Sequence, residues 1–282
     1  MTSANAKAIS AVMEIPGRKM DFDYALEDLP RYWFDNDAFK STYMGALSCQ
    51  FPEGERMFMD SVRDHLDQIK DPRLQEQVKG FIKQEAMHGH EHGKFNEFLD
   101  TLGYPASRYE AFQAKERKWM RKHVPAKHML AATCALEHFT AIMAHWVLTD
   151  PMATEGMDQR FKELWKWHAI EETEHKAVAF DVYQETVGSY WIRIIAMINV
   201  TIMFCLRTAM LQSVFLWKDG KLFSPKTWFS AIKMTFGPRR GIIPNLFRNY
   251  IDYFRPDFHP WDHDNRELLK EWEAGHDNYK VI

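Results

Sequence analysis

The residues of this sequence best suited to chemistry are glutamates and histidines set into apolar helical stripes. Between about residues 72 and 101, apolar side chains recur every three or four residues, as on one face of a helix. The stripe is apolar at both ends and ionisable at its centre. Its members are Val78, Phe81, Glu85, His88, His92, Phe95 and Leu99.

A second stripe repeats this pattern further along the chain. Its members are Phe161, Trp165, His168, Glu172, His175, Ala179 and Val182. Two other predicted helices each place a single carboxylate in an apolar stripe. Glu55 lies in a helix that we expect to begin near Pro52, because proline suits the first helical position, and Glu137 lies in the helix around 130–148.

A buried carboxylate costs free energy unless it is paired or binds a metal ion. The three-residue spacing of Glu85 with His88, and of Glu172 with His175, places each pair on one helix face within reach of a single ion. Two helices that each give Glu and two that each give Glu-x-x-His form the ligand set of di-iron and di-manganese bundles. We therefore predict two metal ions, held and used by Glu55, Glu85, His88, Glu137, Glu172 and His175. Iron suits this oxygen-rich set best, and manganese or zinc would also fit.

Several neighbouring residues leave alternatives open. His92 and His168 lie one turn from the predicted ligands and could be further ligands, hydrogen-bond partners of ligands or core histidines. Glu171 and Glu174 lie off the stripe, so we expect them to be solvated or to support the ligands. Asp181 is a candidate hydrogen-bond acceptor for a ligand histidine. The residues expected at the surface are His90, Glu91 and His138.

These stripes imply an all-α protein with a four-helix bundle over residues 38–186. Turn signals at Asp71-Pro72, Gly103-Tyr104-Pro105, Pro125 and Asp150-Pro151 separate its helices. The 52 residues from Glu85 to Glu137 allow a long crossover between two helical hairpins. Residues 1–37 are predicted to be an irregular arm, and 187–282 a helical extension that packs on the bundle.

Five motifs resemble a bacterial family described as predicted metal-dependent hydrolases, within the ferritin-like superfamily. They are FPEGE at 51–55, QEAMHGHEH at 84–92, ALEHFTA at 135–141, WHAIEETEHKAVAFDVY at 167–183 and FHPWDHDN at 258–265. The resemblance covers the chain from about residue 40 and implies a ferritin-like fold with a dinuclear metal site. The last motif holds His259 and His263, for which we expect a packed turn, with a further metal site as the alternative.

Two close metals suit either oxidation by O₂ or hydrolysis by metal-bound hydroxide. We expect a di-iron or Fe/Mn oxidase or oxygenase, because apolar residues flank the stripes and would suit a hydrophobic substrate. These residues are Phe58, Phe81, Phe95, Cys134 and Trp165. An external electron donor is then a candidate partner, and a metal-dependent hydrolase is the alternative function.

Composition and charge limit the partners and the cellular location that we expect. A formal charge of −3 with mixed signs argues against nucleic-acid binding. Three scattered cysteines (Cys49, Cys134, Cys205) and a polar N-terminus favour the cytoplasm. Residues 189–217 are very apolar, but Arg193 and Arg207 interrupt them. We expect a helix that is buried or lies on a membrane surface, so the protein could be peripheral to the inner membrane. The extension at 187–282 could cover the mouth of the bundle and shape an apolar pocket, and a homodimer interface through the extension is an equal alternative.

Overall fold

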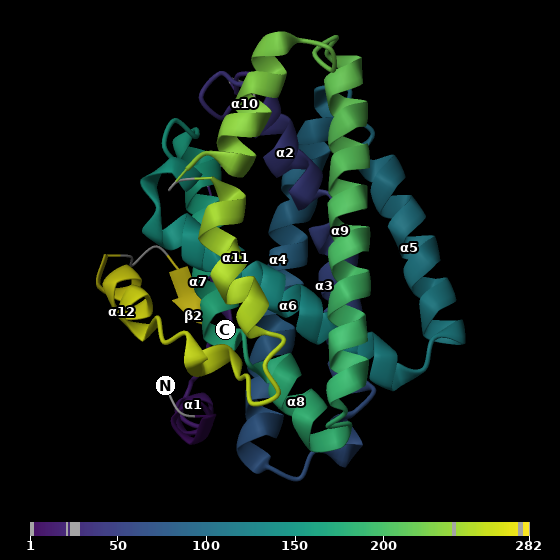
Figure 1. Ribbon diagram of the computed structural model, residues 1–282, viewed down its shortest axis with the longest axis vertical. Helices are drawn as coiled ribbons and strands as arrows, with labels where there is room; N and C mark the ends of the chain where they lie inside the picture. Colours follow the sequence, from purple (N-terminus) through teal and green to yellow (C-terminus); the bar gives the residue numbers. More distant parts are fainter. Residues whose placement is uncertain (1–2, 21, 23–28, 239–240, 276–278, 282) are drawn as a thin grey trace.

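The computed structural model describes residues 3–20, 22, 29–238, 241–275 and 279–281, and most of them are helical (Figure 1). The helices of the first half are α1 (Ser3–Ser10), α2 (Ala38–Ser48), α3 (Phe51–Arg63), α4 (Pro72–Thr101), α5 (Ala106–His123) and α6 (Ala126–Thr149). Those of the second half are α7 (Gln159–His175), α8 (Val178–Thr186), α9 (Tyr190–Lys218), α10 (Pro225–Phe236), α11 (Ile242–Asp252) and α12 (Arg266–Gly275). Short 3-10 turns lie at Leu66–Gln68, Pro151–Ala153 and Pro260–Asp262. The predicted all-α class is confirmed.

Two three-residue strands are the exception within the described part of the chain. β1 (Arg18–Met20) pairs antiparallel with β2 (Tyr279–Val281), so that Arg18 lies opposite Val281. The pair joins the two ends of the chain. The arm before residue 38 is thus not wholly irregular, since it contains α1 and β1 and is tied to the C-terminal segment.

The turn signals act where the sequence predicts them. Pro52 lies in the first turn of α3, which begins at Phe51. Asp71 caps α4 by accepting a hydrogen bond from the backbone N–H of Arg73, and Pro72 follows in the first turn. Asp158 caps α7 in the same way through Arg160.

Helices α3, α4, α6 and α7 pack against one another as a helical bundle. α3 and α4 form one hairpin, α6 and α7 form the other, and α5 makes the crossover between them. The hairpins meet through α3 with α6 and α4 with α7. This arrangement positions the four glutamate-bearing stripes toward one interior.

The interior has apolar ends and a polar centre. At one end of α4, Val78 and Phe81 pack into a cluster that also contains Val62 of α3 and Leu130 of α6. At the other end, Phe95 and Leu99 pack in a separate cluster with Phe161 of α7. The buried residues of α4 between these two apolar clusters are all polar.

The fourth predicted helix is interrupted, which the sequence pattern does not predict. α7 ends at His175, and α8 begins at Val178. Lys176 lies in the interruption with its ammonium group buried, where it donates to the carbonyl oxygen of His263 and to Asn265 Oδ1, each at 2.7 Å. The stripe is therefore divided immediately after His175.

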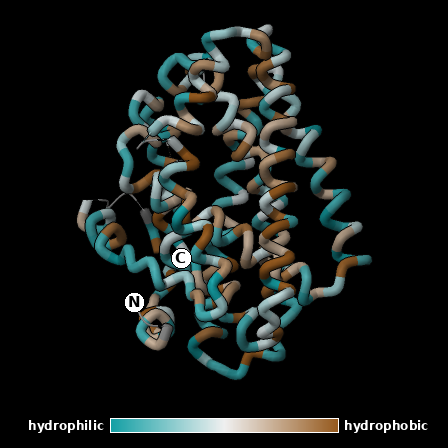
Figure 2. Tube along the Cα trace, in the orientation of Figure 1, coloured by the Kyte–Doolittle hydropathy of each residue, from teal (hydrophilic) through white to brown (hydrophobic). Residues whose placement is uncertain are grey.

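The C-terminal extension covers the bundle on one side. α9 packs on α2 and α6, α10 on α2 and α11, and α11 on α6. In Figure 2, hydrophobic residues recur along α9, which lies in front of the bundle in this view. Among the described helices, α9 is the one that is long and apolar enough to cross a membrane.

Candidate metal centre

Six side chains from four helices converge in the polar centre of the bundle. Each of the six residues is at most 2% exposed. They are Glu55 from α3, Glu85 and His88 from α4, Glu137 from α6, and Glu172 and His175 from α7. These are the six residues for which the sequence predicts a metal-binding role.

One half of the centre surrounds His175. Its Nε2 atom lies 3.1 Å from Glu85 Oε1, 3.5 Å from Glu172 Oε2 and 3.6 Å from Glu137 Oε2. The imidazole therefore faces three carboxylates that come from three different helices.

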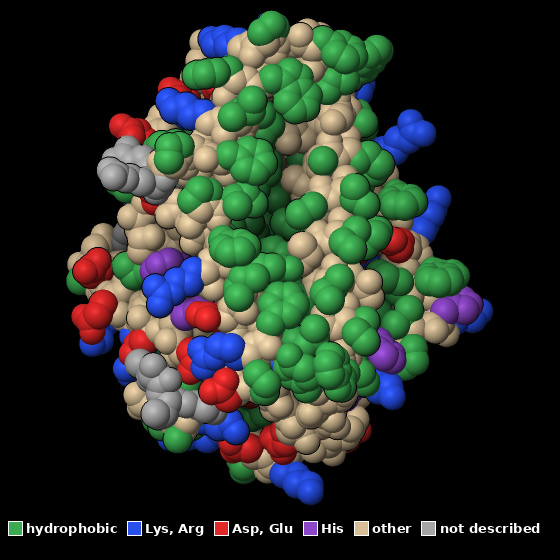
Figure 3. All heavy atoms as spheres, viewed as in Figure 1, with side chains coloured by type: hydrophobic (Ala, Val, Ile, Leu, Met, Phe, Trp, Pro, Cys, Tyr) green, Lys and Arg blue, Asp and Glu red, His purple; other side chains and the backbone are tan. Residues whose placement is uncertain are grey.

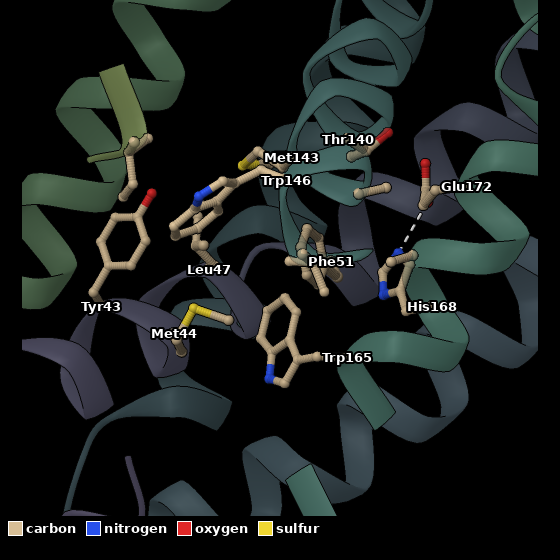
Figure 4. A pocket seen from close by; sticks show the side chains of 14 residues that line it. Tyr43, Met44, Leu47, Phe51, Thr140, Met143, Trp146, Trp165, His168 and Glu172 are labelled. Atoms are coloured by element: carbon tan, nitrogen blue, oxygen red, sulfur yellow. Dashed lines mark hydrogen bonds and ion pairs between the residues drawn. The ribbon is translucent and has the colours of Figure 1, made fainter. Parts of the chain in front are cut away.

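The other half surrounds His88 and His168. The Oε1 atom of Glu172 lies 3.6 Å from His88 Nδ1 and 2.9 Å from His168 Nε2, and Figure 4 draws the second of these contacts. His168 Nε2 also lies 3.9 Å from Glu55 Oε1. The two oxygens of Glu172 thus face different halves of the centre, as expected for a carboxylate that bridges two ions.

Three groups of donor atoms are compact enough to hold a metal ion. Within each group, the atoms lie within 4.8 Å of one another. The groups are Glu55 with His88 and His168, Glu85 with Glu137 and His175, and Glu85 with His88 and Glu172. Glu85 and His88 each belong to two groups, so the groups are adjacent and share donors. The assignment of the individual ligands remains a prediction.

The polar atoms of this centre are suited to binding a metal cation. Among the described residues, both carboxylate oxygens of Glu55, Glu85 and Glu137 are buried without a hydrogen-bond partner, and so is His175 Nε2. Each buried, unsatisfied group costs about 1–3 kcal/mol or more when it is charged. Metal ions would satisfy these atoms together, since carboxylate oxygen and imidazole nitrogen are the ligands that iron, manganese and zinc accept.

Protonation balances the charge of the cluster when metal is absent. Burial raises the pKa of the carboxyl groups of Glu55, Glu85 and Glu137 well above the ordinary value. Burial acts likewise on Glu172, but the charge of His175 and the hydrogen bond from His168 hold its pKa well below that value. Burial would lower the pKa of His175, yet the Glu172 and Glu137 carboxylates raise it to about 9.

A second layer of side chains holds the two predicted ligand histidines. Gln84 Oε1 accepts from His175 Nδ1 at 2.9 Å, and Gln84 Nε2 donates to Glu174 Oε2 at 2.7 Å. Arg18 of β1 binds both oxygens of Glu174 at 2.6 Å. These contacts orient His175 so that its Nε2 faces the carboxylates.

Arg18 also connects to the other histidine. Its guanidinium lies 3.4 Å from Glu171 Oε1, and Glu171 Oε2 lies 3.1 Å from His88 Nε2. One buried arginine from the N-terminal arm therefore joins the supports of both histidines. Arg18 was not predicted as part of the site, because nothing in the sequence around it indicates that the arm reaches the bundle interior.

The structure separates the roles of the two extra histidines. His92 uses both ring nitrogens on protein partners, with Nδ1 2.9 Å from Ser48 Oγ and Nε2 2.7 Å from His168 Nδ1. His168 turns its other nitrogen toward Glu172 and Glu55. The geometry favours His168 as a further ligand and His92 as the residue that orients it.

The structure decides several expectations for neighbouring residues. Glu171 and Glu174 are not solvated, at 0% and 3% exposed, and take the other expected role of supporting the predicted ligand histidines. Glu91 and His138 are buried rather than at the surface, whereas His90 is exposed as expected. His138 Nε2 lies 3.0 Å from the carbonyl oxygen of Asn249, since α11 covers that side of α6.

The two histidines of the C-terminal motif, His259 and His263, each contact an aspartate that lies outside the motif. Asp181 binds His259 Nε2 at 2.9 Å and the Ser10 hydroxyl at 2.5 Å, so its partner is not a predicted ligand histidine. His263 Nε2 lies 2.8 Å from Asp252 Oδ2. Within the described part of the chain, no group suited to a metal ion contains His259 or His263. This geometry is that of the expected packed turn.

Aromatic rings border the centre and a small cavity opens beside it. The ring of Phe81 lies 5.0 Å from that of His175, and the ring of Phe51 lies 4.9 Å from that of His168. The cavity has a volume of about 40 Å³, and Phe51, Trp165, His168 and Glu172 are among its lining residues (Figure 4). A second cavity, of about 250 Å³, reaches Glu55 from the side of α5 and α9.

The comparison with known families agrees with this geometry. Residues 16–264 match the family described as "Predicted metal-dependent hydrolase". No curated protein and no solved structure matches the chain. The match covers most of the chain and confirms the family predicted from the five motifs, while membership of the ferritin-like superfamily remains a prediction. The chain belongs to the family of predicted metal-dependent hydrolases.

Proposed function

We propose that this protein is a two-metal enzyme that acts on an apolar substrate beside His168 and Glu172. The convergence of four buried glutamates with His88 and His175 carries the proposal. Glu55 and His88, with His168, would hold one ion, and Glu137 and His175 the other. Glu85 and Glu172 would reach both ions.

Oxidation by O₂ is the chemistry that the site supports best. Bound iron, when reduced, would supply the electrons that O₂ needs. The cavity beside the centre has a wall of apolar and aromatic side chains, and no Lys or Arg is among its described lining residues. Hydrolysis of a carboxyl or phosphoryl group calls for donors aimed at the oxygen that gains charge. Phe51 and Trp165 would instead exclude water and hold an apolar group.

Hydrolysis is the second candidate, and the family description supports it better than oxidation. Two adjacent metal ions can bind and polarise a water molecule and a substrate oxygen. Thr140 and His168 are polar groups at the same cavity that could contact such a substrate.

Metal-loaded protein separates these two chemistries. Iron-loaded protein, reduced without air and then mixed with O₂, should consume O₂ and develop near-ultraviolet absorption, and an apolar acid or aromatic compound should accelerate the reaction. The zinc-loaded protein should leave a panel of esters, amides and phosphate esters intact. Turnover of that panel by the zinc form, with reduced iron protein inert to O₂, would establish hydrolysis instead.

A further inference from the structure

Exposed apolar side chains gather on one face of the molecule, over α9, α10 and α11 (Figure 3). On α9 they repeat every three or four residues, opposite the side that packs on the bundle, and are 46–69% exposed. They are Trp191, Ile195, Ile198, Ile202, Leu206 and Met210. Monomeric proteins rarely expose a contiguous apolar patch larger than a few hundred Å². We name the exposed side of α9–α11 the docking face. Its apolar area indicates that it binds a partner.

The two shorter helices extend this face. α10 exposes Phe229, Ile232 and Phe236 at 61–73%. α11 exposes Ile243 and Phe247 at 47% and 60%. Because α10 packs on α11 and α9 packs beside them on α2 and α6, the three stripes form one surface rather than three separate patches.

The charge around the docking face is strongly one-sided. The span of α9–α11, residues 190–252, contains nine Lys or Arg and two acids, whereas the rest of the chain contains 27 Lys or Arg and 37 acids. One acid is Asp219, whose carboxylate is buried against Arg31 and Tyr104, and the other is Asp252, which contacts His263 at the end of α11. Within the described part of this span, the exposed cations are Lys218, Lys221, Lys226, Lys233 and Arg248. An apolar face with a basic border complements anionic lipid, as in helices that lie in the membrane interface.

Aromatic residues lie at the ends of the apolar stripes. Trp191 and Trp217 lie near the two ends of α9, 69% and 65% exposed. Phe223 and Trp228 follow at the turn into α10 and its first turn. Tryptophan favours the level of the lipid head groups, because its ring is apolar and its N–H is polar.

Polar contacts tie α9 to the body, so that it lies along the protein and does not stand free. Arg193 is buried and donates to the carbonyl oxygens of Tyr253 and Arg255 at 2.5 and 2.9 Å. Thr208 Oγ1 accepts from Gln50 Nε2 at 2.9 Å, and Gln212 donates to the carbonyl oxygen of Phe39 at 3.1 Å. Lipid around the whole of α9 would break these contacts, and no lipid group replaces them.

We infer that the docking face binds the surface of an anionic membrane, with α9, α10 and α11 in its plane and the bundle outside it. A second copy fits less well. A symmetric contact through this face would bring each basic border against its own copy, and no exposed acid among described residues 190–251 would neutralise it.

The docking face also leads toward the metal centre. A groove of about 500 Å³ opens between α9 and the α10–α11 pair, visible as a hollow in Figure 3. Tyr43, Met143 and Ile242 line both this groove and the small cavity beside His168 and Glu172. Given the proposed function, a lipid-soluble substrate would enter from the membrane through this groove.

Vesicle binding by the full-length protein tests the inference without any activity measurement. The protein should float with vesicles that contain phosphatidylglycerol, bind phosphatidylcholine alone more weakly, and be released by high salt or carbonate. The double variant Phe229→Ser/Ile232→Ser should lower the partition coefficient by roughly tenfold or more, because both side chains would lose apolar area that the membrane buries. The double variant Lys221→Glu/Lys226→Glu should lower the partition coefficient by at least roughly tenfold on anionic vesicles and leave it unchanged on phosphatidylcholine vesicles.

Matched variants elsewhere control for general effects. Val12→Ser, after α1, removes an exposed apolar side chain, and Lys79→Glu on α4 reverses an exposed charge, both outside the docking face. Both should bind vesicles like the unchanged protein. Failure of the unchanged protein to bind anionic vesicles at low salt would overturn the inference. So would a solution dimer that Phe229→Ser/Ile232→Ser converts to monomer, or retention on membranes after carbonate. Vesicle binding without metal-dependent turnover would leave the inference intact and count against the proposed function.

Discussion

At the scale of single residues, the centre combines groups that destabilise one another without a cation. Glu55, Glu85 and Glu137 are buried, and their neighbours in the cluster are also carboxylates. Their raised pKa values mean that the metal-free protein keeps protons on them at a pH where an exposed glutamate has lost its proton. Metal binding must displace these protons and the proton of His175, whose pKa is about 9.

This linkage predicts a pH dependence. A group whose pKa is higher in the folded state stabilises the fold at low pH, and this stabilisation is lost as pH rises through the folded pKa. The metal-free protein therefore loses these contributions from Glu55, Glu85, Glu137 and His175 as pH rises, whereas bound metal replaces the protons. The rise in Tm on adding Mn²⁺ should grow between about pH 6.5 and pH 9, because the pKa of His175 is raised from 6.5 to about 9.

Calorimetry in two buffers of different ionisation enthalpy would count the protons released on binding. Lys176, whose pKa burial lowers to about 7, also titrates in this pH range. Because Lys176 is not a predicted ligand, its contribution to stability should largely cancel when the metal-bound and metal-free proteins are compared. A metal-induced Tm rise that is independent of pH, without proton release, would contradict the protonated cluster.

Most residues of the centre could be predicted from the sequence, because each predicted ligand interrupts an apolar stripe with helical periodicity. The residues that hold the ligand histidines in place were harder to predict. Gln84 lies beside a predicted ligand, yet a glutamine next to a stripe is ordinary at a helix surface. Arg18 is about 150 residues from Glu171 and Glu174, and only the folded arm brings them together. No local pattern could show that contact.

At the scale of elements, α3 and α4 approach closely where the site needs it. A Cβ atom on Gly89 would lie 3.0 Å from Glu55 Oε2, whereas one on Gly93, a turn later, would meet nothing within 4 Å. Both glycines lie inside α4, where alanine favours the helix by about 0.5–1 kcal/mol. The two positions differ in their contact with a predicted ligand.

Gly89→Ala should therefore weaken metal binding, since the methyl group would displace the Glu55 carboxylate. Gly93→Ala should leave metal affinity unchanged and raise the stability of the metal-free protein by up to about 1 kcal/mol. Metal titration and thermal unfolding of both variants, with and without metal, would measure this. Equal metal affinity in the two variants would show that Glu55 is free to move or is not a ligand.

Helix starts were predictable where a proline marks them. Pro52 and Pro72 act through backbone chemistry that is local in sequence. Asp158, which caps α7, is equally local but was not predicted. The interruption between α7 and α8 contains neither proline nor glycine, and Lys176 there binds the segment after α11. His138 was misplaced for a similar reason, because Asn249 of α11, more than 100 residues later in the sequence, covers it.

At the scale of the whole molecule, the chain divides its chemistry between two places. The interior of α3, α4, α6 and α7 collects the ionisable residues, and α9–α11 collect the exposed apolar residues and an excess of positive charge. The near-neutral total charge does not indicate this uneven distribution of charge, which is seen only when the charged residues are assigned to individual helices. The apolar run at 189–217 indicated a surface or buried helix, but not that two later helices extend the same face.

Binding of two metal ions in the bundle interior by the six predicted residues is the central prediction for this protein. Metal content per chain tests it directly, measured on protein saturated with Fe²⁺ without air and then freed of loose metal. The unchanged protein should hold two ions per chain. Glu85→Gln and Glu172→Gln should each lose at least one, whereas Glu91→Gln, which alters another buried glutamate of α4 outside the three donor groups, should keep both. Two ions per chain in Glu85→Gln and Glu172→Gln, or none in the unchanged protein, would contradict the metal centre.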